Sequence, residues 1–319
     1  MRPRRALPIV VVVLCAMLVV MSAASLRANE QPAPSPSDLV PVVDSAPQPT
    51  EPPPAATLIA AGDIAACGAG DADATARLLD AIDGTIQTLG DNAYESGTEA
   101  EFANCFDPAW GRFRSRMRPA PGNHEYLTAN ATGYFKYFGA AAGDPKKGYY
   151  SYDLGTWHIV VLNGECGAIG GCGPSSTEAI WLHMDLAAST ATCTLAVWHE
   201  PRWSSGVEHG SDPRYGTFWN ELYAAGAEIV LNGHDHDYER FAPQNPDGQR
   251  DDAQGMREFV VGTGGRSLYP VKPPIVNSEV LRNDSFGVLV LTLGVDRYDW
   301  RFVPVEGSSF TDSGTGTCH

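Results

Sequence analysis

Five short motifs in the sequence carry side chains of the kinds that bind metal ions in proteins. They are Gly62-Asp63, Gly90-Asp91-Asn92-Ala93-Tyr94, Gly122-Asn123-His124-Glu125, Val197-Trp198-His199 and Gly233-His234-Asp235-His236. A single Gly-Asp pair after a strand is usually only a turn, whereas His234 and His236 place two imidazoles close together. Carboxylate, carboxamide, phenol and imidazole groups together suit a pair of metal ions. The five motifs therefore predict a dinuclear metal site.

These motifs follow, or lie near, short apolar runs that are typical of buried strands. Such runs cover residues 58–61, 86–89, 157–162, 194–198 and 228–231. Because apolar segments this short are bounded by glycine and polar residues, they predict strands rather than helices. Helical stretches lie between them, so we expect an α/β domain with the ligands at the carboxyl ends of strands.

The last third of the chain is more purely β in character. Residues 258–261 and 288–293 form apolar runs. The helical stretches that separate such runs earlier in the chain are less clear here. They predict a second sheet packed against the first.

The clearest helix signal begins at residue 175. Ser175 and Glu178 have the spacing of a capping box, in which two side chains satisfy free N–H groups of the first turn. Ile180, Met184 and Ala187 then fall on one face of the expected helix.

The first residues of the chain have the layout of a secretory signal peptide. Three arginines among the first five residues precede an apolar run from Ala6 to Ala24 that ends in small residues. The run is close to the shortest length that spans a bilayer, so an uncleaved anchor is the alternative. Residues 1–28 are expected to be a signal peptide or N-terminal anchor, and the protein to be secreted or held at the cell surface.

A proline-rich segment separates this signal from the folded part. Residues 29–56 contain nine prolines and no apolar periodicity, which predicts a disordered tether. We expect the catalytic domain at residues 57–304 and a C-terminal tail at 305–319. Membrane contact is expected only through the N-terminal segment, if it is not cleaved.

The overall charge limits the choice of partner. The formal net charge is −16 and the isoelectric point is near 4.8. A surface that binds nucleic acid by neutralising phosphates is therefore not expected. An anionic substrate would need positive charge supplied locally.

The cysteines indicate disulfides. Removal of Cys15 with the signal leaves six cysteines, and an even number in an exported chain favours pairing. Cys166 and Cys172 flank a glycine-rich loop and are the preferred pair. Six cysteines allow fifteen pairings, and the spacing alone does not choose among the others.

Taken together, the five motifs resemble those of the metallophosphoesterase (calcineurin-like) superfamily, and within it the purple acid phosphatase branch, here of an exported bacterial type. The resemblance covers most of residues 57–304 and implies a four-layer α/β/β/α sandwich with two mixed sheets. It implies two ligand sets that share one aspartate. The first metal would be held by Asp63, Asp91, Tyr94 and His236, and the second by Asp91, Asn123, His199 and His234.

Two positions select the branch. Related phosphodiesterases and protein phosphatases often carry a histidine two residues after the first aspartate, where this chain has Ala65. Tyr94 would supply the metal ligand that this histidine provides in those relatives. By resemblance to the purple enzymes, this tyrosine implies Fe3+ at the site. The other ion would be divalent iron, zinc or manganese. Ala65 departs from the glycine that is usual in that branch.

Such a site predicts hydrolysis of a phosphate ester. Two ions can hold a hydroxide between them as the nucleophile and clamp the phosphoryl oxygens. Two carboxylates and one phenolate bring three negative charges against five positive charges of the ions, so the pocket stays cationic.

The histidines outside the ligand set divide into two groups. His124, beside Asn123, is placed to protonate the leaving alkoxide, and His209 resembles the substrate-facing histidines of the family. For both, a structural hydrogen bond is the alternative. Glu125 is expected to orient a neighbouring histidine rather than to do chemistry. The other histidines, at positions 158, 183 and 319, join no ligand pattern.

The predicted function is therefore that of an exported, acid-phosphatase-like enzyme acting on phosphate monoesters. A phosphodiesterase or nucleotidase on the same metal core is the alternative, because the ligands do not encode the leaving group. A metal-binding surface module without turnover is a third interpretation, against which the complete ligand set argues.

Overall fold

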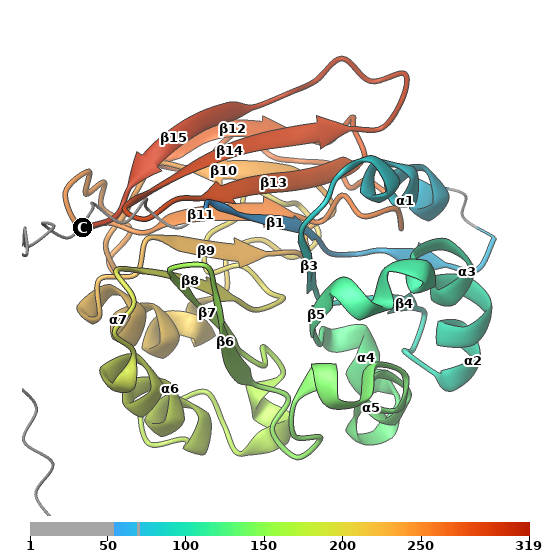
Figure 1. The fold of residues 1–319 in the computed structure, drawn as a ribbon, viewed down its shortest axis with the longest axis horizontal. Helices are drawn as coiled ribbons and strands as arrows, with labels where there is room; N and C mark the ends of the chain where they lie inside the picture. Colours follow the sequence, from blue (N-terminus) through green and yellow to red (C-terminus); the bar gives the residue numbers. More distant parts are fainter. Residues whose placement is uncertain (1–53, 69–70) are drawn as a thin grey trace, which may run out of the picture. The chain divides into compact units, whose positions relative to one another are not determined.

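The computed structural model describes residues 54–68 and 71–319, and its centre is a pair of mixed sheets (Figure 1). The six-stranded sheet has the order β15-β14-β13-β1-β3-β5. Its strands are β1 (Ala56–Ala61), β3 (Thr85–Leu89), β5 (Met117–Ala120), β13 (Gly287–Leu293), β14 (Arg297–Pro304) and β15 (Ser313–Thr317). β1, β3 and β5 are parallel, whereas β13, β14 and β15 pair antiparallel.

The second sheet has seven strands in the order β12-β10-β11-β9-β8-β7-β6. Their bounds are β6 (Tyr150–Leu154), β7 (Trp157–Val161), β8 (Cys193–Val197), β9 (Ile229–Asn232), β10 (Tyr238–Phe241), β11 (Arg257–Val261) and β12 (Ser278–Arg282). The central strands β7, β8, β9 and β11 are parallel, and the outer ones pair antiparallel. Two short strands, β2 (Ala65–Ala66) and β4 (Ala93–Tyr94), form a separate parallel pair.

Side-chain alternation along the second sheet shows that it is covered on both faces. Ile159 and Leu195 belong to the core shared with the six-stranded sheet. Their neighbours Val160 and Ala196 point the other way, into a core with Phe218 of the adjoining helix layer. Because successive residues of a strand point to opposite faces, a sheet buried on both sides reads as a continuous apolar run.

Helices complete the outer layers. The α-helices are α1 (Asp71–Ala81), α2 (Glu99–Glu101), α3 (Asp107–Trp110), α4 (Asn123–Leu127), α5 (Thr132–Phe138), α6 (Thr177–Ala188) and α7 (Gly216–Ala224). One π-helical segment (Phe102–Phe106) and short 3-10 segments at Gly111–Arg116, Ala129–Ala131, Gly139–Ala142, Cys166–Ile169 and Pro213–Tyr215 complete the set. α6 and α7 lie together against the second sheet, while α1 to α5 lie on the side of the six-stranded sheet (Figure 1). The predicted four-layer α/β/β/α arrangement is confirmed.

Helix α6 begins one residue later than the capping pattern predicts. Ser176, not Ser175, is the N-cap, and its hydroxyl accepts the N–H of Ala179 at 3.2 Å. Glu178 is buried and accepts the N–H of Asn163 at 2.7 Å instead of closing a capping box. The Glu178 side chain, which the local pattern assigned to the cap, therefore makes a tertiary contact instead.

The face of α6 marked by Ile180, Met184 and Ala187 is the exposed face. Ile180 is 51% exposed and Met184 is 65% exposed, whereas Ala179 and Leu182 are buried. Ala179 and Leu182, three residues apart, form the face through which the helix packs. The apolar face identified from the sequence is therefore the one that faces solvent.

The folded domain extends beyond residue 304, where we expected a tail to begin. β15 (Ser313–Thr317) pairs with β14 at the edge of the six-stranded sheet. Cys318 then forms a disulfide with Cys193, the first residue of β8. The last residues are thus part of the domain.

All six cysteines that follow Cys15 are paired. The expected bond between Cys166 and Cys172 is confirmed, and Cys67 pairs with Cys105. The predicted signal peptide or anchor and most of the predicted tether lie outside the described residues. In the part of the chain that is described, no helix has the length and apolar character to cross a bilayer.

Candidate metal centre

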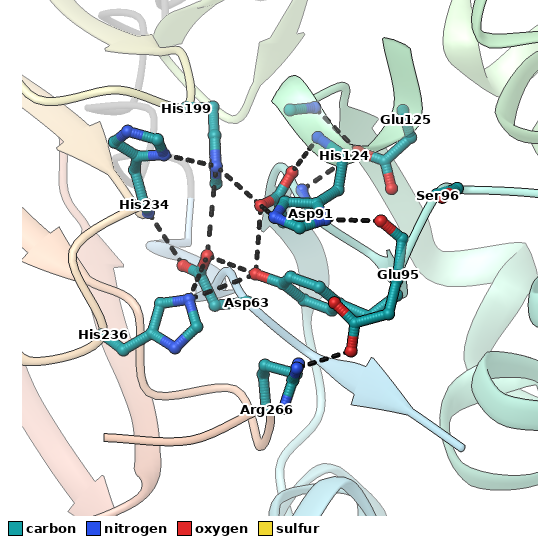
Figure 2. A network of polar contacts seen from close by, with 12 residues as sticks. Asp63, Asp91, Glu95, Ser96, His124, Glu125, His199, His234, His236 and Arg266 are labelled. Atoms are coloured by element: carbon teal, nitrogen blue, oxygen red, sulfur yellow. Dashed lines mark hydrogen bonds and ion pairs between the residues drawn. The ribbon is translucent and has the colours of Figure 1, made fainter. Parts of the chain in front are cut away.

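The predicted ligands lie where parallel strands end. Asp63 follows β1, Asp91 follows β3, His199 follows β8 and His234 follows β9, each two residues beyond the strand. Parallel strands present their carboxyl ends on one edge, so the two sheets bring these side chains together. The side chains that point toward one another in Figure 2 are those of Asp63, Asp91, His199, His234 and His236.

Three of these residues adopt a backbone conformation that side chains seldom take. Asp63, Asp91 and His234 have φ angles of 59°, 47° and 73°. The left-handed region costs a non-glycine residue about 1–2 kcal/mol. Each follows a glycine directly after the strand, where the chain must turn sharply to aim the side chain inward. Such strain concentrates at functional sites.

Two glycines permit the close approach of the chain segments. A Cβ on Gly90 would lie 2.5 Å from Nδ1 of His199, and one on Gly122 would lie 2.3 Å from Oδ1 of Asp91. Neither position accepts a side chain without displacing a predicted ligand.

The first donor group surrounds the hydroxyl of Tyr94. This oxygen lies 2.8 Å from Oδ1 of Asp63, 3.0 Å from Oδ2 of Asp91 and 3.2 Å from Nε2 of His236. Nε2 of His236 is itself 3.3 Å from Oδ1 of Asp63. All four side chains are at least 97% buried.

The second donor group shares Asp91. Nε2 of His199 lies 3.2 Å from Oδ2 of Asp91 and 3.3 Å from Nδ1 of His234. One ligand atom from each of these three residues lies within 4.8 Å of the others. Asn123 starts α4 beside them, and its buried Oδ1 has no hydrogen-bond partner among the described residues.

The tautomer of His199 suits metal binding. Its Nδ1 lies 2.7 Å from the backbone carbonyl of Leu89, which can only accept, so Nδ1 carries the proton. Nε2, which lies beside Asp91, is therefore the nitrogen that remains for a metal ion. His236 is held in a similar way by Oγ of Ser267, 2.9 Å from its Nδ1. A second partner that fixes the ring is typical of metal-ligating histidines.

The residues present fit a pair of metal ions. Ligand bonds of roughly 2.1 Å place neighbouring donors about 3 Å apart, and the donors of both groups have that spacing. A metal ion would also give the unpaired Oδ1 of Asn123 a partner. The seven predicted ligands thus lie at one edge of the sandwich, six of them in direct mutual contact.

The electrostatics of the centre favour cations. Burial, followed by the charges of Asp63 and Asp91, raises the pKa of Tyr94 well above its usual value. Burial opposes ionisation of Asp91, but the nearby histidines, His199 first, hold the pKa of this carboxyl well below its usual range. Burial and the charge of His199 lower the pKa of His234.

Glu125 organises the backbone of the site and contacts no histidine ring. Its carboxylate accepts N–H groups from Gly122 at 2.7 Å, Asn92 at 2.8 Å, Asp91 at 3.0 Å and Ala93 at 3.3 Å. Burial and the charge of Asp91 raise the pKa of Glu125 to about 8. The expectation that it orients a histidine is wrong, because the strand-end N–H groups converge on it instead.

His124 lies at the margin of the donor groups. Its Nδ1 is 2.6 Å from the carbonyl oxygen of Glu95, so Nδ1 donates there (Figure 2). Its Nε2 is 3.8 Å from Oδ2 of Asp91. The second nitrogen is therefore directed to the centre and is partly accessible to solvent.

His209 reaches the centre by stacking. Its exposed ring stacks on that of His234, with ring centroids 3.8 Å apart and an angle of 30° between the ring planes. It comes from the loop between β8 and α7 (Figure 1).

The loop after β11 contributes contacts that sequence reasoning missed. The guanidinium of Arg266 lies 5.1 Å from the ring of Tyr94 and pairs with Glu95 at 2.5 Å (Figure 2). Tyr269 stacks on His236 with centroids 3.8 Å apart. The available signal was the run of glycines directly after a predicted strand, which resembles the other strand-end motifs but contains no metal-binding side chain.

The chain belongs to the calcineurin-like phosphoesterase family, because the model of that family matches residues 56–238, more than half of the chain. The family consists of phosphoric ester hydrolases, so the resemblance drawn from the motifs is confirmed at this level.

Among known proteins, the chain is similar to plant purple acid phosphatases. It is 28% identical to purple acid phosphatase 15 of Arabidopsis thaliana over 204 residues, which cover 53% of this chain and 38% of that protein. It is 27% identical to purple acid phosphatase 21 of the same plant over 254 residues, 71% of this chain and 54% of that protein. The chain spans about half the length of these relatives, or less.

Solved structures share the fold. The purple acid phosphatase PPD1 from yellow lupin superposes with a TM-score of 0.71 at 16% identity, over 82% of this chain and 54% of that one. GAP50, described as the anchor in the inner membrane complex of Plasmodium, superposes with a TM-score of 0.65 at 13% identity, over 83% and 90%. At such identities these structures speak for the fold alone.

Proposed function

We propose that the protein is an exported phosphatase that hydrolyses phosphate monoesters at a dinuclear metal centre. The observation that carries this proposal is the position of Asp91. One of its oxygens lies 3.0 Å from the hydroxyl of Tyr94 and 3.2 Å from Nε2 of His199, so a single carboxylate joins both donor groups. A shared carboxylate is what two adjacent ions require.

The donor types support a proposal for the two ions. Asp63, Tyr94 and His236 would hold Fe3+ together with Asp91, because an anionic phenolate pairs best with a highly charged cation. Asn123, His199 and His234 would hold a divalent iron, zinc or manganese ion together with Asp91. When bound, the two ions supply positive charge for the phosphoryl oxygens and lower the pKa of water.

The chain's own residues bind the substrate and move the proton. Nδ1 of His124 is committed to a backbone carbonyl, so Nε2 is the atom that delivers a proton to the leaving oxygen. His209 contributes its exposed ring at the mouth of the site, where it contacts the phosphate ester. Glu125 fixes the segment that carries Asp91.

Three disulfides support export. Bonds between Cys67 and Cys105 and between Cys193 and Cys318 join distant parts of the chain, and such bonds persist in oxidising surroundings. These bonds support the proposed location outside the cytoplasm, where the protein would be either released or held by its N-terminal segment.

The test combines activity, metal content and colour. Purified protein should hydrolyse p-nitrophenyl phosphate faster than bis(p-nitrophenyl) phosphate, contain iron, and absorb visible light through the Fe3+–phenolate bond. Faster hydrolysis of the diester would instead identify a phosphodiesterase on the same core. Bound metal without hydrolysis of either ester would instead identify a metal-binding module without turnover.

Matched variants separate the metal centre from general damage. Asp91→Asn and His234→Ala should lose bound metal and at least a hundredfold in kcat/KM. His183→Ala removes an exposed histidine whose ring pairs with Glu221 on α7, and it should keep both. Full activity and full metal content in the first two variants would refute the dinuclear site.

A further inference from the structure

One buried carboxylate binds both ends of the loop that carries His209, beside a bond from the N–H of Ser204 to Oγ of Ser211 at 3.0 Å. Asp235 is completely buried, and its Oδ2 accepts the hydroxyl of Ser204 at 2.5 Å and the N–H of Gly210 at 2.9 Å. These two partners are the first and last residues of the segment 204–210. A single oxygen atom thus ties both ends of the loop together.

The middle of the loop is pressed against the same carboxylate. A Cβ on Gly206 would lie 2.0 Å from Oδ1 of Asp235, so glycine is needed there for the approach. The N–H of Gly206 donates to Oγ of Ser204 at 2.9 Å, which links the turn to the hydrogen-bonded end.

A second carboxylate holds only the start of the loop. Glu239 accepts the N–H of Ser205 at 2.7 Å and its hydroxyl at 2.6 Å. Loss of Asp235 should therefore free the end of the loop near Gly210 while its beginning stays attached.

The residue before Asp235 supports the ring itself. His234 stacks against His209, so two consecutive residues after β9 determine where the ring lies. His234 supports its face, and Asp235 fixes the backbone directly after it through Gly210.

We propose that Asp235 is a positioning residue that holds His209 over the metal centre for contact with the phosphate ester. This role is positional, because Oδ2 of Asp235 accepts its two hydrogen bonds from the loop. The role in catalysis rests on the proposed function, in which His209 contacts the substrate. The hydrogen-bonded closure of the loop does not depend on that function.

A double-mutant cycle tests whether Asp235 acts through His209. Asp235→Ala should lower kcat for p-nitrophenyl phosphate at least tenfold with unchanged metal content, and His209→Ala should lower it about a hundredfold. In the double variant, the loss should equal that of His209→Ala within about twofold. A loss of kcat in the double variant equal to the product of the two single losses would overturn the proposal. Loss of metal from Asp235→Ala would also overturn it.

Hydrogen exchange tests the closure without any substrate. The amides of Gly206 and Gly210 should exchange at least tenfold faster in Asp235→Ala than in the wild type. Asp235→Asn should be intermediate, because its amide oxygen can still accept both bonds but carries no charge. Glu228→Gln alters another buried carboxylate, which accepts the N–H of Thr194, and should leave this loop unchanged. Equal exchange in wild type and Asp235→Ala would refute the closure. A wild type without phosphatase activity but with the faster exchange in Asp235→Ala would refute only the proposed function.

Discussion

Replacement of Glu125 tests how the metal centre is built. The carboxylate accepts four N–H groups: Oε2 receives those of Asp91 and Gly122, and Oε1 receives those of Asn92 and Ala93. A glutamine has one acceptor oxygen, so two N–H groups would face an amide that also donates. At about 1–3 kcal/mol for each buried donor left unpaired, the loss in unfolding free energy is about 2–6 kcal/mol.

Glu101 offers a matched control. It also accepts several backbone N–H groups, those of Glu95, Ser96 and Thr98, but it is partly exposed, so water can replace the lost acceptor. Glu101→Gln should therefore cost less than about 1 kcal/mol. The hydroxyl of Thr98 is a fourth donor to Glu101, at 2.8 Å, so the two variants differ in burial rather than in the number of bonds.

Urea denaturation of the metal-free proteins at pH 9, above the pKa of about 8 of Glu125, measures both losses with the carboxylates ionised. Metal titration should in addition show roughly 10–100-fold weaker binding in Glu125→Gln, because Asp91 is no longer held in its strained conformation. Equal unfolding free energies for Glu125→Gln and Glu101→Gln would refute the assignment of Glu125 as the organiser of the strand ends.

Three further predictions concern the proposed ligand Tyr94, a buried histidine and a long-range disulfide. Tyr94→Phe should abolish visible absorption, whereas Tyr269→Phe should keep it; colour in the first variant would exclude a phenolate ligand. The pKa of His158 is raised, first by its hydrogen bond to Asp185, so its contribution to stability is full below about pH 6.5 and is lost as the pH rises through its folded pKa. The stability difference between wild type and His158→Gln, about 1 kcal/mol, should therefore shrink from pH 5.5 to pH 9, and a constant difference would contradict this. Replacement of Cys193 and Cys318 by serine should lower the unfolding free energy by about 4–5 kcal/mol, since the bond closes a separation of 125 residues, and an unchanged urea midpoint would exclude such a contribution.

The sequence predicted the strand ends that meet at the centre, because Asp63, Asp91, His199 and His234 each follow an apolar strand by two residues. Burial on both faces makes the strands read as continuous apolar runs, and parallel pairing collects their ends. Glycine before Asp63, Asp91 and His234 marked the sharp turns, although not the left-handed conformation of the ligands themselves.

What escaped prediction depends on tertiary contacts. Glu178 looked like a capping residue but is bound by a backbone N–H of another segment, and Glu125 collects N–H groups from two strand ends. β15 has no apolar pattern, because Gly314 and Gly316 lie against the rings of Trp300 and Tyr298, where a Cβ would come within 2.3 Å. The aromatic surface of the neighbouring strand replaces side chains that β15 lacks.

The bond between Cys193 and Cys318 joins the start of β8 to the residue after β15, and so links the two sheets covalently. While this bond is intact, β15 stays near the sheet even when its hydrogen bonds to β14 open, because Cys318 remains attached to β8. Such an opening can therefore reverse quickly. The backbone N–H and C=O groups of β14 are then exposed only briefly to pairing with another chain.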